Sequence, residues 1–367
     1  MTGFVQSIIT ILLFIFILGA LVVIHELGHF VMARLYKVRV LEFGVGFPPR
    51  AKVLRNKGET VYTLNWLPIG GFVKLEGEDG NDADDPRSFS AQSLPKRLII
   101  LVAGVAMNVL LAFAIFTGIA LFADPAVGIE VGGVQAGGPA ATAGLVVGDQ
   151  IVSVNGDPHA AFDRVSPTAS LRALAGETVT LGVVAADGTT RDVVVTLRPA
   201  SEIDATHGAL GIEDSTTIVL AEPIDYGLGE AIQIGAQRTV DALGLIVGGL
   251  ATLVESIATR PTEGPPVSGP VGIATQLGDV FWQLGPIFTL YVAGVLSANL
   301  AVVNILPFPP LDGGRMLMIT LKRFFGDRMS LRAEQMTYMV GFVFLFAFLI
   351  WVTGYDIVRS LTGGSGT

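Results

Sequence analysis

Two histidines and a glutamate form the stretch of the chain that is best suited to catalysis. Residues 22–35 read VVIHELGHFVMARL, and His25, Glu26 and His29 give the pattern H-E-x-x-H. Side chains four positions apart lie on one face of a helix, so both imidazoles can bind the same metal ion. Zinc is the metal that this pattern predicts, and Glu26 is placed to take a proton from water. The stretch therefore predicts a zinc site with Glu26 as the catalytic base.

The location of this motif is unusual because the motif directly follows a long uncharged segment. No charged residue occurs from Met1 to Ile24. Ionisable side chains at bilayer depth are costly and by default mark a functional site. A metal-free pair of core histidines is the plain alternative, which the glutamate between them disfavours. The segment has no positively charged start and no small-residue cleavage site, so we interpret it as a membrane span and not as a signal peptide.

Composition places the chain among membrane proteins. Its 367 residues are 51% hydrophobic and 15% charged, whereas a soluble globular protein carries about 25% charged residues. The chain has no cysteine, which excludes disulfides, thiol catalysis and thiolate metal sites. It also has no concentrated basic patch of the kind that binds nucleic acid, so we expect no nucleic-acid partner.

Four segments are long and apolar enough to cross a bilayer, which takes about 20 residues. The predicted transmembrane helices are 1–35, 98–122, 281–315 and 336–358. The first carries the H-E-x-x-H motif. Within the third, we expect the helix to run from about Ile287 to Leu306.

The segments between these helices differ in character. Residues 36–97 alternate apolar and polar and are rich in glycine, which predicts a membrane-associated β-hairpin region with turns at 56–58 and 68–71. A hairpin on the protein surface is the alternative. Residues 123–200 contain short strands and a short helix, which indicates an α+β module. The other predicted segments are a linker with amphipathic helices at 201–280, a loop at 316–335 and a flexible tail at 359–367.

The charges predict on which side of the membrane each segment lies. Basic residues outnumber acidic ones in 34–97 and 307–335, whereas acidic residues predominate in 123–285, which has no lysine. By the positive-inside rule, the first two segments are cytoplasmic and the third is extracytoplasmic. The H-E-x-x-H motif then lies near the cytoplasmic side. A helix over 225–258 is expected either on the membrane surface or packed against the spans.

A zinc site needs a third protein ligand and an open position for catalysis. His159 and His207 fall in the extracytoplasmic region, and there is no cysteine, so a carboxylate is expected. Asp312, in NILPFPPLDGGR, follows the uncharged third span at its cytoplasmic end. On its own this aspartate would be read as a helix cap or turn residue, but the unfilled zinc position favours a ligand. The prolines at 307, 309 and 310 would end the helix beside it.

The pair of motifs HELGH and NILPFPPLDGG resembles the site-2 protease family of intramembrane zinc metalloproteases, in particular the bacterial, sigma-factor-regulating type with one PDZ domain. The resemblance extends to the G-x-G sequence at Gly44 and Gly46, to SLPKRLIILVAGVAMN and to VSGPVGIA, and so covers nearly the whole chain. Val105 departs from the proline that family members often have there. This departure affects no predicted ligand.

The resemblance implies roles for several residues. It implies a Zn2+ cofactor bound by His25, His29 and Asp312, with Glu26 as the catalytic base. Residues expected beside the substrate are Asn304, Gly44, Gly46, Pro307 and Pro309. The implied reaction is hydrolysis of peptide bonds within or near the transmembrane segment of single-pass membrane proteins, such as anti-sigma factors and remnant signal peptides. The implied location is the inner or plasma membrane of a bacterium, in contact with the lipid bilayer.

The extracytoplasmic module contains GGPAATAGLVVGDQIVSVNG, which resembles a PDZ domain. The expected fold is thus a multi-pass α-helical membrane protein with about four transmembrane helices, a membrane-associated β-hairpin region and an inserted α+β PDZ domain. PDZ grooves bind extended peptide ends by strand addition, so a peptide C-terminus is an expected partner. Screening of substrates by size is the other role that the resemblance implies. A non-catalytic, PDZ-bearing membrane adaptor is the alternative function, although it would predict the loss of a metal-site residue, and none is lost.

Overall fold

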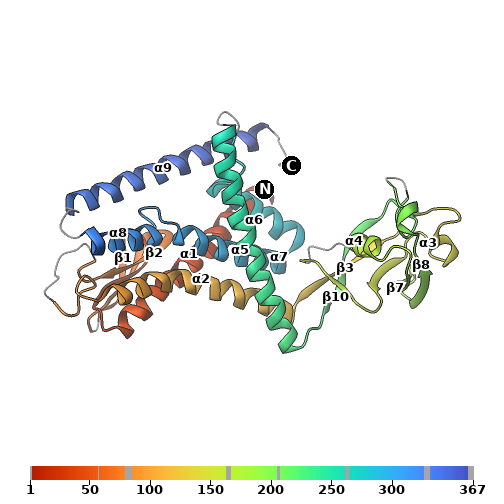
Figure 1. Ribbon diagram of the computed structural model, residues 1–367, viewed down its shortest axis with the longest axis horizontal. Helices are drawn as coiled ribbons and strands as arrows, with labels where there is room; N and C mark the ends of the chain where they lie inside the picture. The colour runs from red at the N-terminus through yellow and green to blue at the C-terminus, as the bar shows by residue number, and fades with distance from the viewer. Residues whose placement is uncertain are drawn as a thin grey trace. The chain divides into compact units, whose positions relative to one another are not determined.

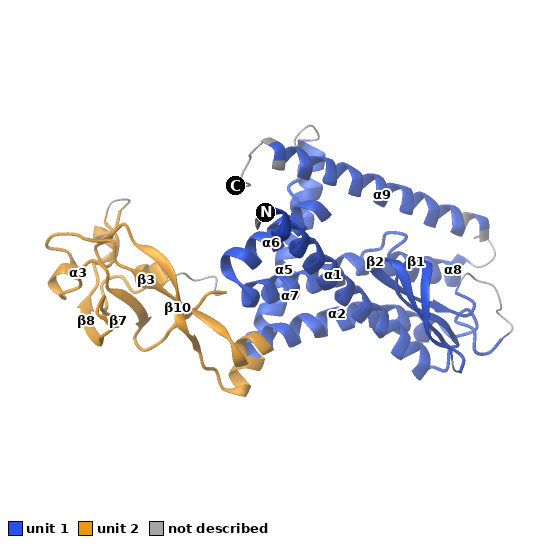
Figure 2. Ribbon diagram, turned by 180° about the vertical axis from the view of Figure 1, so that it is seen from behind, with its two compact units in different colours: residues 1–117, 233–367 blue, residues 118–232 orange. Residues whose placement is uncertain are grey.

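The computed structural model describes residues 2–56, 58–78, 85–162, 167–204, 207–260, 264–325 and 331–362 (Figure 1). The chain divides into two compact units (Figure 2). The first comprises residues 1–117 and 233–367, and it contains most of the apolar helices. The second comprises residues 118–232 and is a small module built mainly of β-strands.

The chain has several long apolar helices, as expected of a helical membrane protein. Helices of the first unit, some of which extend into the second, are α1 (Thr2–Leu35), α2 (Leu94–Phe122), α5 (Leu228–Thr259), α6 (Pro270–Leu284), α7 (Pro286–Ile305), α8 (Asp312–Phe325) and α9 (Leu331–Thr362). Among the described residues, α1, α2, α5, α7 and α9 are long and apolar enough to cross a membrane. Four of them match the predicted spans, and α5 is the additional one.

The helix expected from about Ile287 to Leu306 agrees with α7, but the chain breaks twice within the wider predicted segment 281–315. Gly285, with φ of 90°, separates α6 from α7 in a conformation that glycine adopts readily. After α7, the prolines between 307 and 310 lack the N–H that a helix needs, so the chain turns before α8 begins. The predicted loop 316–335 is also corrected, since α8 occupies its first part. Residues 326–330 of that loop and 363–367 of the predicted tail lie outside the described residues.

Strands β1 (Val40–Asn56) and β2 (Val61–Leu75) form the predicted hairpin region, and each strand bends so that it pairs twice. Gly44 pairs with both Thr63 and Phe72, which places the segment around Gly44 between two parts of β2. The turn predicted at 68–71 is therefore a bend within β2, where Gly70 has φ of 88°. Of the other predicted turn, Lys57 lies outside the described residues. In the described pairing, the end of β2 has a strand partner on one side only and forms a sheet edge.

Helices α1 and α2 approach each other closely because a glycine lies at their contact. A Cβ atom at Gly28 would lie only 2.3 Å from the carbonyl oxygen of Ala103. Small residues allow this approach between membrane helices, whose association is driven by packing because lipid is as apolar as the side chains. Beyond this contact, a buried cluster joins the end of α1, the start of β1 and the first turns of α2; its members include Ala33, Val38, Val40, Ile100 and Leu101.

Helix α9 is attached to the rest of the first unit near both of its ends. Towards its start, Gly341 packs against the backbone of Pro309, where a Cβ would lie 2.0 Å from the carbonyl oxygen. Towards its end, the buried Asp356 carboxylate accepts hydrogen bonds from the N–H groups of Gly269 (3.2 Å) and Gly272 (2.8 Å). Gly269 is the N-cap of α6, so a carboxylate from α9 satisfies the unpaired donors at the start of another helix.

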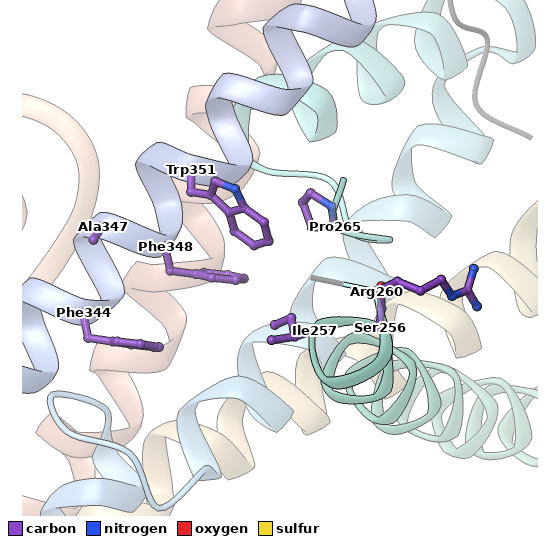
Figure 3. Close-up of a pocket in the computed structure, with 8 residues that line it drawn as sticks. All are labelled: Ser256, Ile257, Arg260, Pro265, Phe344, Ala347, Phe348 and Trp351. Carbon is purple, nitrogen blue, oxygen red and sulfur yellow. The ribbon is translucent and has the colours of Figure 1, made fainter. Parts of the chain in front are cut away.

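An apolar groove separates the middle of α9 from the end of α5. Figure 3 shows aromatic side chains of α9 projecting towards α5, with Pro265 at one end of the groove. The groove is lined by Ser256, Ile257, Arg260, Pro265, Phe344, Ala347, Phe348 and Trp351. Rings of α9 also contact one another beside the groove, since the ring centroids of Phe348 and Trp351 are 5.9 Å apart.

The second unit is an α+β module with one main sheet. Its strands are β3 (Asp124–Glu130), β4 (Gly133–Val134), β5 (Gln150–Val154), β6 (His159–Ala160), β7 (Thr178–Val184), β8 (Thr190–Thr196), β9 (Ile212–Glu213) and β10 (Thr216–Ile224). The main sheet has the order β10-β3-β5-β7-β8, and β6 also pairs with β3. Its helices are α3 (Pro139–Thr142), α4 (Pro167–Ala173) and the short 3-10 helix η1 (Ala200–Glu202).

The module is larger than predicted, because β9 and β10 fall within the expected linker 201–280. Strand β10 pairs with β3 along the sheet, and Leu210, just before β9, is buried in the core of the module. The core side chains are Ile129, Val131, Leu145, Ile151, Leu181, Val195 and Leu197, among others. The linker prediction failed because β10 is mostly exposed and so lacks the apolar alternation of a half-buried strand.

The contact of Asp356 with the start of α6 leads to a stability prediction. Asp356→Ala leaves the buried N–H groups of Gly269 and Gly272 without an acceptor, and we expect it to lower the free energy of unfolding by about 1–3 kcal/mol. Asp356→Asn keeps one acceptor and should lose less. The measurement is thermal unfolding in detergent, with Asp279→Ala, an exposed aspartate of α6, as the control. An unfolding temperature of Asp356→Ala equal to that of the wild type would show that the contact between α9 and the start of α6 does not stabilise the protein.

Candidate metal centre

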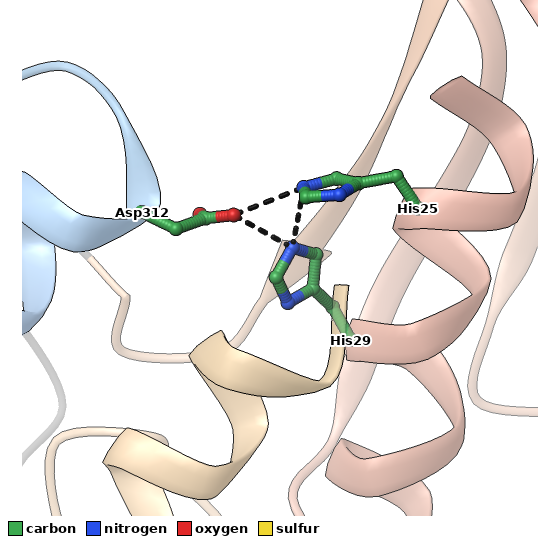
Figure 4. A group of neighbouring side chains, drawn as sticks. All are labelled: His25, His29 and Asp312. Atoms are coloured by element: carbon green, nitrogen blue, oxygen red, sulfur yellow. Dashed lines mark hydrogen bonds and ion pairs between the residues drawn. The ribbon is translucent and has the colours of Figure 1, made fainter. Parts of the chain in front are cut away.

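Three side chains from two distant parts of the sequence meet in the interior of the first unit. The Oδ2 atom of Asp312 lies 2.9 Å from Nε2 of His25 and 3.2 Å from Nε2 of His29. The two Nε2 atoms are 3.1 Å apart. Figure 4 shows the two rings and the carboxylate converging on one point. In the described parts of the chain, this is the one group of three or more potential ligands placed closely enough to hold a metal ion.

The donor set fits zinc. Two imidazole nitrogens and a carboxylate oxygen are common zinc ligands, and three protein ligands leave the open position that catalysis requires. Zinc–ligand bonds of about 2.0–2.1 Å in a tetrahedron separate the ligand atoms by roughly 3.3 Å. The three observed separations are within a few tenths of an ångström of that value. Both histidines are buried, so the ligands are shielded from bulk water.

Glycines bring Asp312 into this position. Asp312 is the first residue of α8, directly after the proline-containing loop. A Cβ at Gly313 would lie 2.1 Å from the carbonyl oxygen of Ile305, and one at Gly314 would lie 2.4 Å from the backbone of Phe308. The sequence LDGG thus allows α8 to begin tightly against the end of α7, with the aspartate directed towards α1.

Helix α2 also borders the two histidines. The Nδ1 atom of His29 lies 2.8 Å from the carbonyl oxygen of Ile100. A Cβ at Gly104 would lie 2.4 Å from Nε2 of His29 and 2.8 Å from Cε1 of His25, so only glycine leaves room for the rings. Asn108 lies next to Nδ1 of His25. Sequence reasoning missed these three residues, although the resemblance included the segment SLPKRLIILVAGVAMN, which contains all of them.

Glu26 contacts the edge of the hairpin sheet. Its Oε2 atom accepts a hydrogen bond of 3.1 Å from the N–H of Val73, near the end of β2. A Cβ at Gly71 would lie 3.7 Å from Cγ of Glu26. The predicted base is therefore next to a strand edge that could pair with an extended peptide.

A cleft opens beside these residues, and we call it the site cleft. It is lined by Val22, His25, Glu26, His29, Phe47, Gly71, Phe72, Val73, Leu75, Glu78, Ile100, Leu101, Leu300, Asn304, Pro310, Leu311, Asp312 and Arg315. Most of this lining is apolar. Its charged residues, besides the predicted site, are Glu78 and Arg315, which form an ion pair between the turn after β2 and α8.

Of the five residues predicted beside the substrate, the structure places Asn304 in the lining of the site cleft. Gly44, Gly46, Pro307 and Pro309 are not part of this lining. The two glycines have structural reasons instead: a Cβ at Gly44 would meet the ring of Phe72, and Gly46 has φ of 78°. Pro309 packs against α9 through Gly341.

Comparison with known proteins agrees with this geometry. The chain matches peptidase family M50 over residues 13–348. A protein of Clostridium acetobutylicum described as a "putative zinc metalloprotease" is 32% identical, over 96% of this chain and 98% of that protein. The "zinc metalloprotease RasP" of Geobacillus kaustophilus is 28% identical, over 97% of this chain and 99% of that protein. The similarity is thus nearly full-length on both sides.

The family match covers both the segment with His25 and His29 and the segment with Asp312, so it includes every side chain of the converging group. The chain belongs to peptidase family M50, the site-2 protease family, and is a zinc metalloprotease.

Proposed function

We propose that this protein is an intramembrane endopeptidase that cuts single-pass membrane proteins within or near their transmembrane segment. In this proposal, His25, His29 and Asp312 bind the zinc ion and Glu26 is the catalytic base. The observation that carries it is the meeting of Asp312 with the H-E-x-x-H face of a bilayer-length helix. Anti-sigma factors and remnant signal peptides are substrates of the expected kind, since each has a single span.

The burial pattern of α1 supports a site at membrane depth. His25 and His29 are 6% and 7% exposed, so they face the protein interior. On the same helix, Leu27 and Val31 are 37% and 48% exposed. An apolar side chain exposed on such a helix is suited to contact with lipid, whereas ionisable groups in a span face inward. The site therefore belongs to the interior of a membrane-embedded bundle.

The contacts among the helices support four crossings of the membrane. Helix α2 is antiparallel to α1, because Ile100 near its start contacts His29 near the end of α1. Trp282, just before α7, donates a hydrogen bond of 3.1 Å to Thr10 near the start of α1. Helix α7 thus starts on the side where α1 starts and where α2 ends. The part of the chain between the end of α2 and the start of α7 must therefore cross the membrane an even number of times or not at all.

This parity disfavours α5 as a fifth span. A single crossing by α5 would need a second one, and α6 has 15 residues, fewer than the roughly 20 that a span requires. Figure 1 shows α5 running across α2 and not alongside it. We propose that α5 lies at the extracytoplasmic surface of the membrane. The basic segments 34–97 and 307–335 then lie in the cytoplasm of a bacterial cell, and the second unit lies outside.

A substrate helix must unwind before it can be cut, because its amides are hydrogen-bonded within the helix. The edge of β2 offers backbone groups with which an unwound segment can pair. Val73 is on this edge and donates to Glu26, so a peptide paired there would lie beside the proposed base. The side-chain amide of Asn304, in the lining of the site cleft, is suited to hydrogen bonding with the peptide backbone.

The proposed chemistry is general-base hydrolysis. A zinc ion held at this site supplies Lewis-acid polarisation of the scissile carbonyl and activates water. The Glu26 carboxylate takes a proton from the attacking water and passes it to the leaving amine. Both histidines are buried, so the proposed reaction takes place away from bulk water.

We also propose that the second unit is a PDZ domain that selects substrates. The segment GGPAATAGLVVGDQIVSVNG folds as α3 and β5 with their connecting turns, in a sheet-based core. Asn155 is in the left-handed region, with φ of 56°, as its position in a tight turn requires. The module would bind a peptide C-terminus or exclude substrates with a large extracytoplasmic domain.

Replacement of Glu26 tests the catalytic assignment. Glu26→Gln removes the base and keeps the shape of the side chain, so we expect cleavage of a single-pass model substrate to fall by at least about 10²–10⁴-fold. The zinc content should equal that of the wild type. The measurement is cleavage by purified protein in detergent, with zinc quantified in each sample. Glu59→Gln, an exposed glutamate of the hairpin region, is the matched control and should cleave normally.

Two outcomes would contradict the proposal. Normal cleavage by Glu26→Gln would remove Glu26 from the catalytic role. Failure of wild-type protein with stoichiometric zinc to cut any substrate in the panel would favour the non-catalytic adaptor, which needs only the second unit to bind partners.

The absence of native cysteine allows a direct test of the position of α5. Gln237 and Glu255 are both exposed on α5, and 18 residues of helix separate them by about 27 Å, close to the thickness of the hydrocarbon core. We expect Gln237→Cys and Glu255→Cys both to react with a membrane-impermeant maleimide in spheroplasts. Lys52→Cys, in the hairpin region, should react only after lysis. If α5 were a span, one of the two α5 cysteines would also need lysis.

A further inference from the structure

Asn108 lies beside the metal centre and has no assigned role. Its side chain is completely buried in α2. Its Nδ2 atom is 3.4 Å from Nδ1 of His25, while its Oδ1 atom has no hydrogen-bond partner among the described residues. A buried polar atom without a partner is costly, so this oxygen needs an explanation.

The chemistry of a metal-binding histidine supplies that explanation. When Nε2 of a neutral imidazole binds a metal, the proton is on Nδ1, which then acts as a donor. The amide nitrogen of Asn108 is also a donor, so the two groups as placed cannot form a hydrogen bond. Rotation of the amide by 180° exchanges its oxygen and nitrogen. The oxygen can then accept the proton of His25, which satisfies both groups.

We propose that Asn108 is a positioning residue for His25: its side-chain oxygen accepts the Nδ1–H hydrogen bond and directs Nε2 towards His29 and Asp312. The proposal rests on the zinc site proposed above. His29 has the same arrangement, since its Nδ1 contacts the carbonyl oxygen of Ile100 at 2.8 Å. Metal-binding histidines nearly always have such a partner on the second nitrogen.

The spacing along α2 explains how one helix serves both histidines. Positions 100, 104 and 108 recur every four residues and so lie along one face of the helix. At the middle position, Gly104 leaves space for the imidazole rings. Ile100 and Asn108, one turn to either side, contact the Nδ1 atoms of His29 and His25 respectively.

The backbone of Asn108 has a separate contact, which provides a matched control. Its carbonyl oxygen accepts a hydrogen bond of 2.8 Å from Oγ of Ser297, which joins α2 to α7. Ser297→Ala therefore disturbs the same helix contact without removing the partner of His25. An effect on zinc that arises only from helix packing would be equal in Ser297→Ala and in an Asn108 variant.

The experiment measures zinc affinity by competition with a chromophoric chelator, using full-length protein in detergent. Asn108→Leu is apolar and close in size, and we expect it to weaken zinc binding by about 10–100-fold. Asn108→Asp keeps an acceptor oxygen and should retain most of the affinity. Ser297→Ala should bind zinc as the wild type does. Thermal unfolding identifies any variant that does not fold, and Asn108→Ala replaces Asn108→Leu in that case.

Two results would overturn the proposal: wild-type affinity in the apolar variant, or an equal loss in Asn108→Asp. His25→Ala is included to separate this proposal from the zinc site itself. If His25→Ala loses tight zinc binding while the apolar Asn108 variant keeps it, the zinc site stands and the role of Asn108 is refuted. If His25→Ala also keeps zinc, the site assignment fails.

Discussion

The structure depends on how a polar site is satisfied inside an apolar helical bundle. In such an interior, ionisable groups need partners from the protein itself. The two histidines use both ring nitrogens: their Nε2 atoms converge with Asp312, and their Nδ1 atoms face α2. Every helix that contributes must therefore approach closely, and the positions of α1, α2 and α8 follow from this requirement.

Glycine makes this approach possible at each contact. Gly28 lets α1 reach the backbone of α2, Gly104 leaves space for the rings, and Gly313 brings the start of α8 against the end of α7. A side chain at any of these positions would collide with backbone or with a proposed ligand. The same close contacts place Glu26 beside the edge of β2, so the proposed base, zinc ligands and peptide-binding strand belong to one packed assembly.

The sequence predicted the converging group because each part of it has a local signal. The spacing of His25 and His29 requires only a helix, and the scarcity of other ligands indicated Asp312. The contribution of Ile100 was not predictable, since a backbone carbonyl has no signature in the sequence. In the sequence, Asn108 is one polar residue in an apolar span, and no motif indicates its role. The limits of the second unit were missed because the exposed strand β10 lacks a buried face.

The central claim is that one zinc ion is bound by two imidazoles and one carboxylate from α1 and α8. Zinc-edge X-ray absorption of the purified protein tests it most directly. The account predicts one zinc per chain, with scattering from two imidazole rings at about 2.0–2.1 Å. It also predicts that one ring is lost in His29→Ala and that both rings persist in Asp312→Ala if zinc is retained. An unchanged spectrum in His29→Ala, with zinc still bound, would contradict the account.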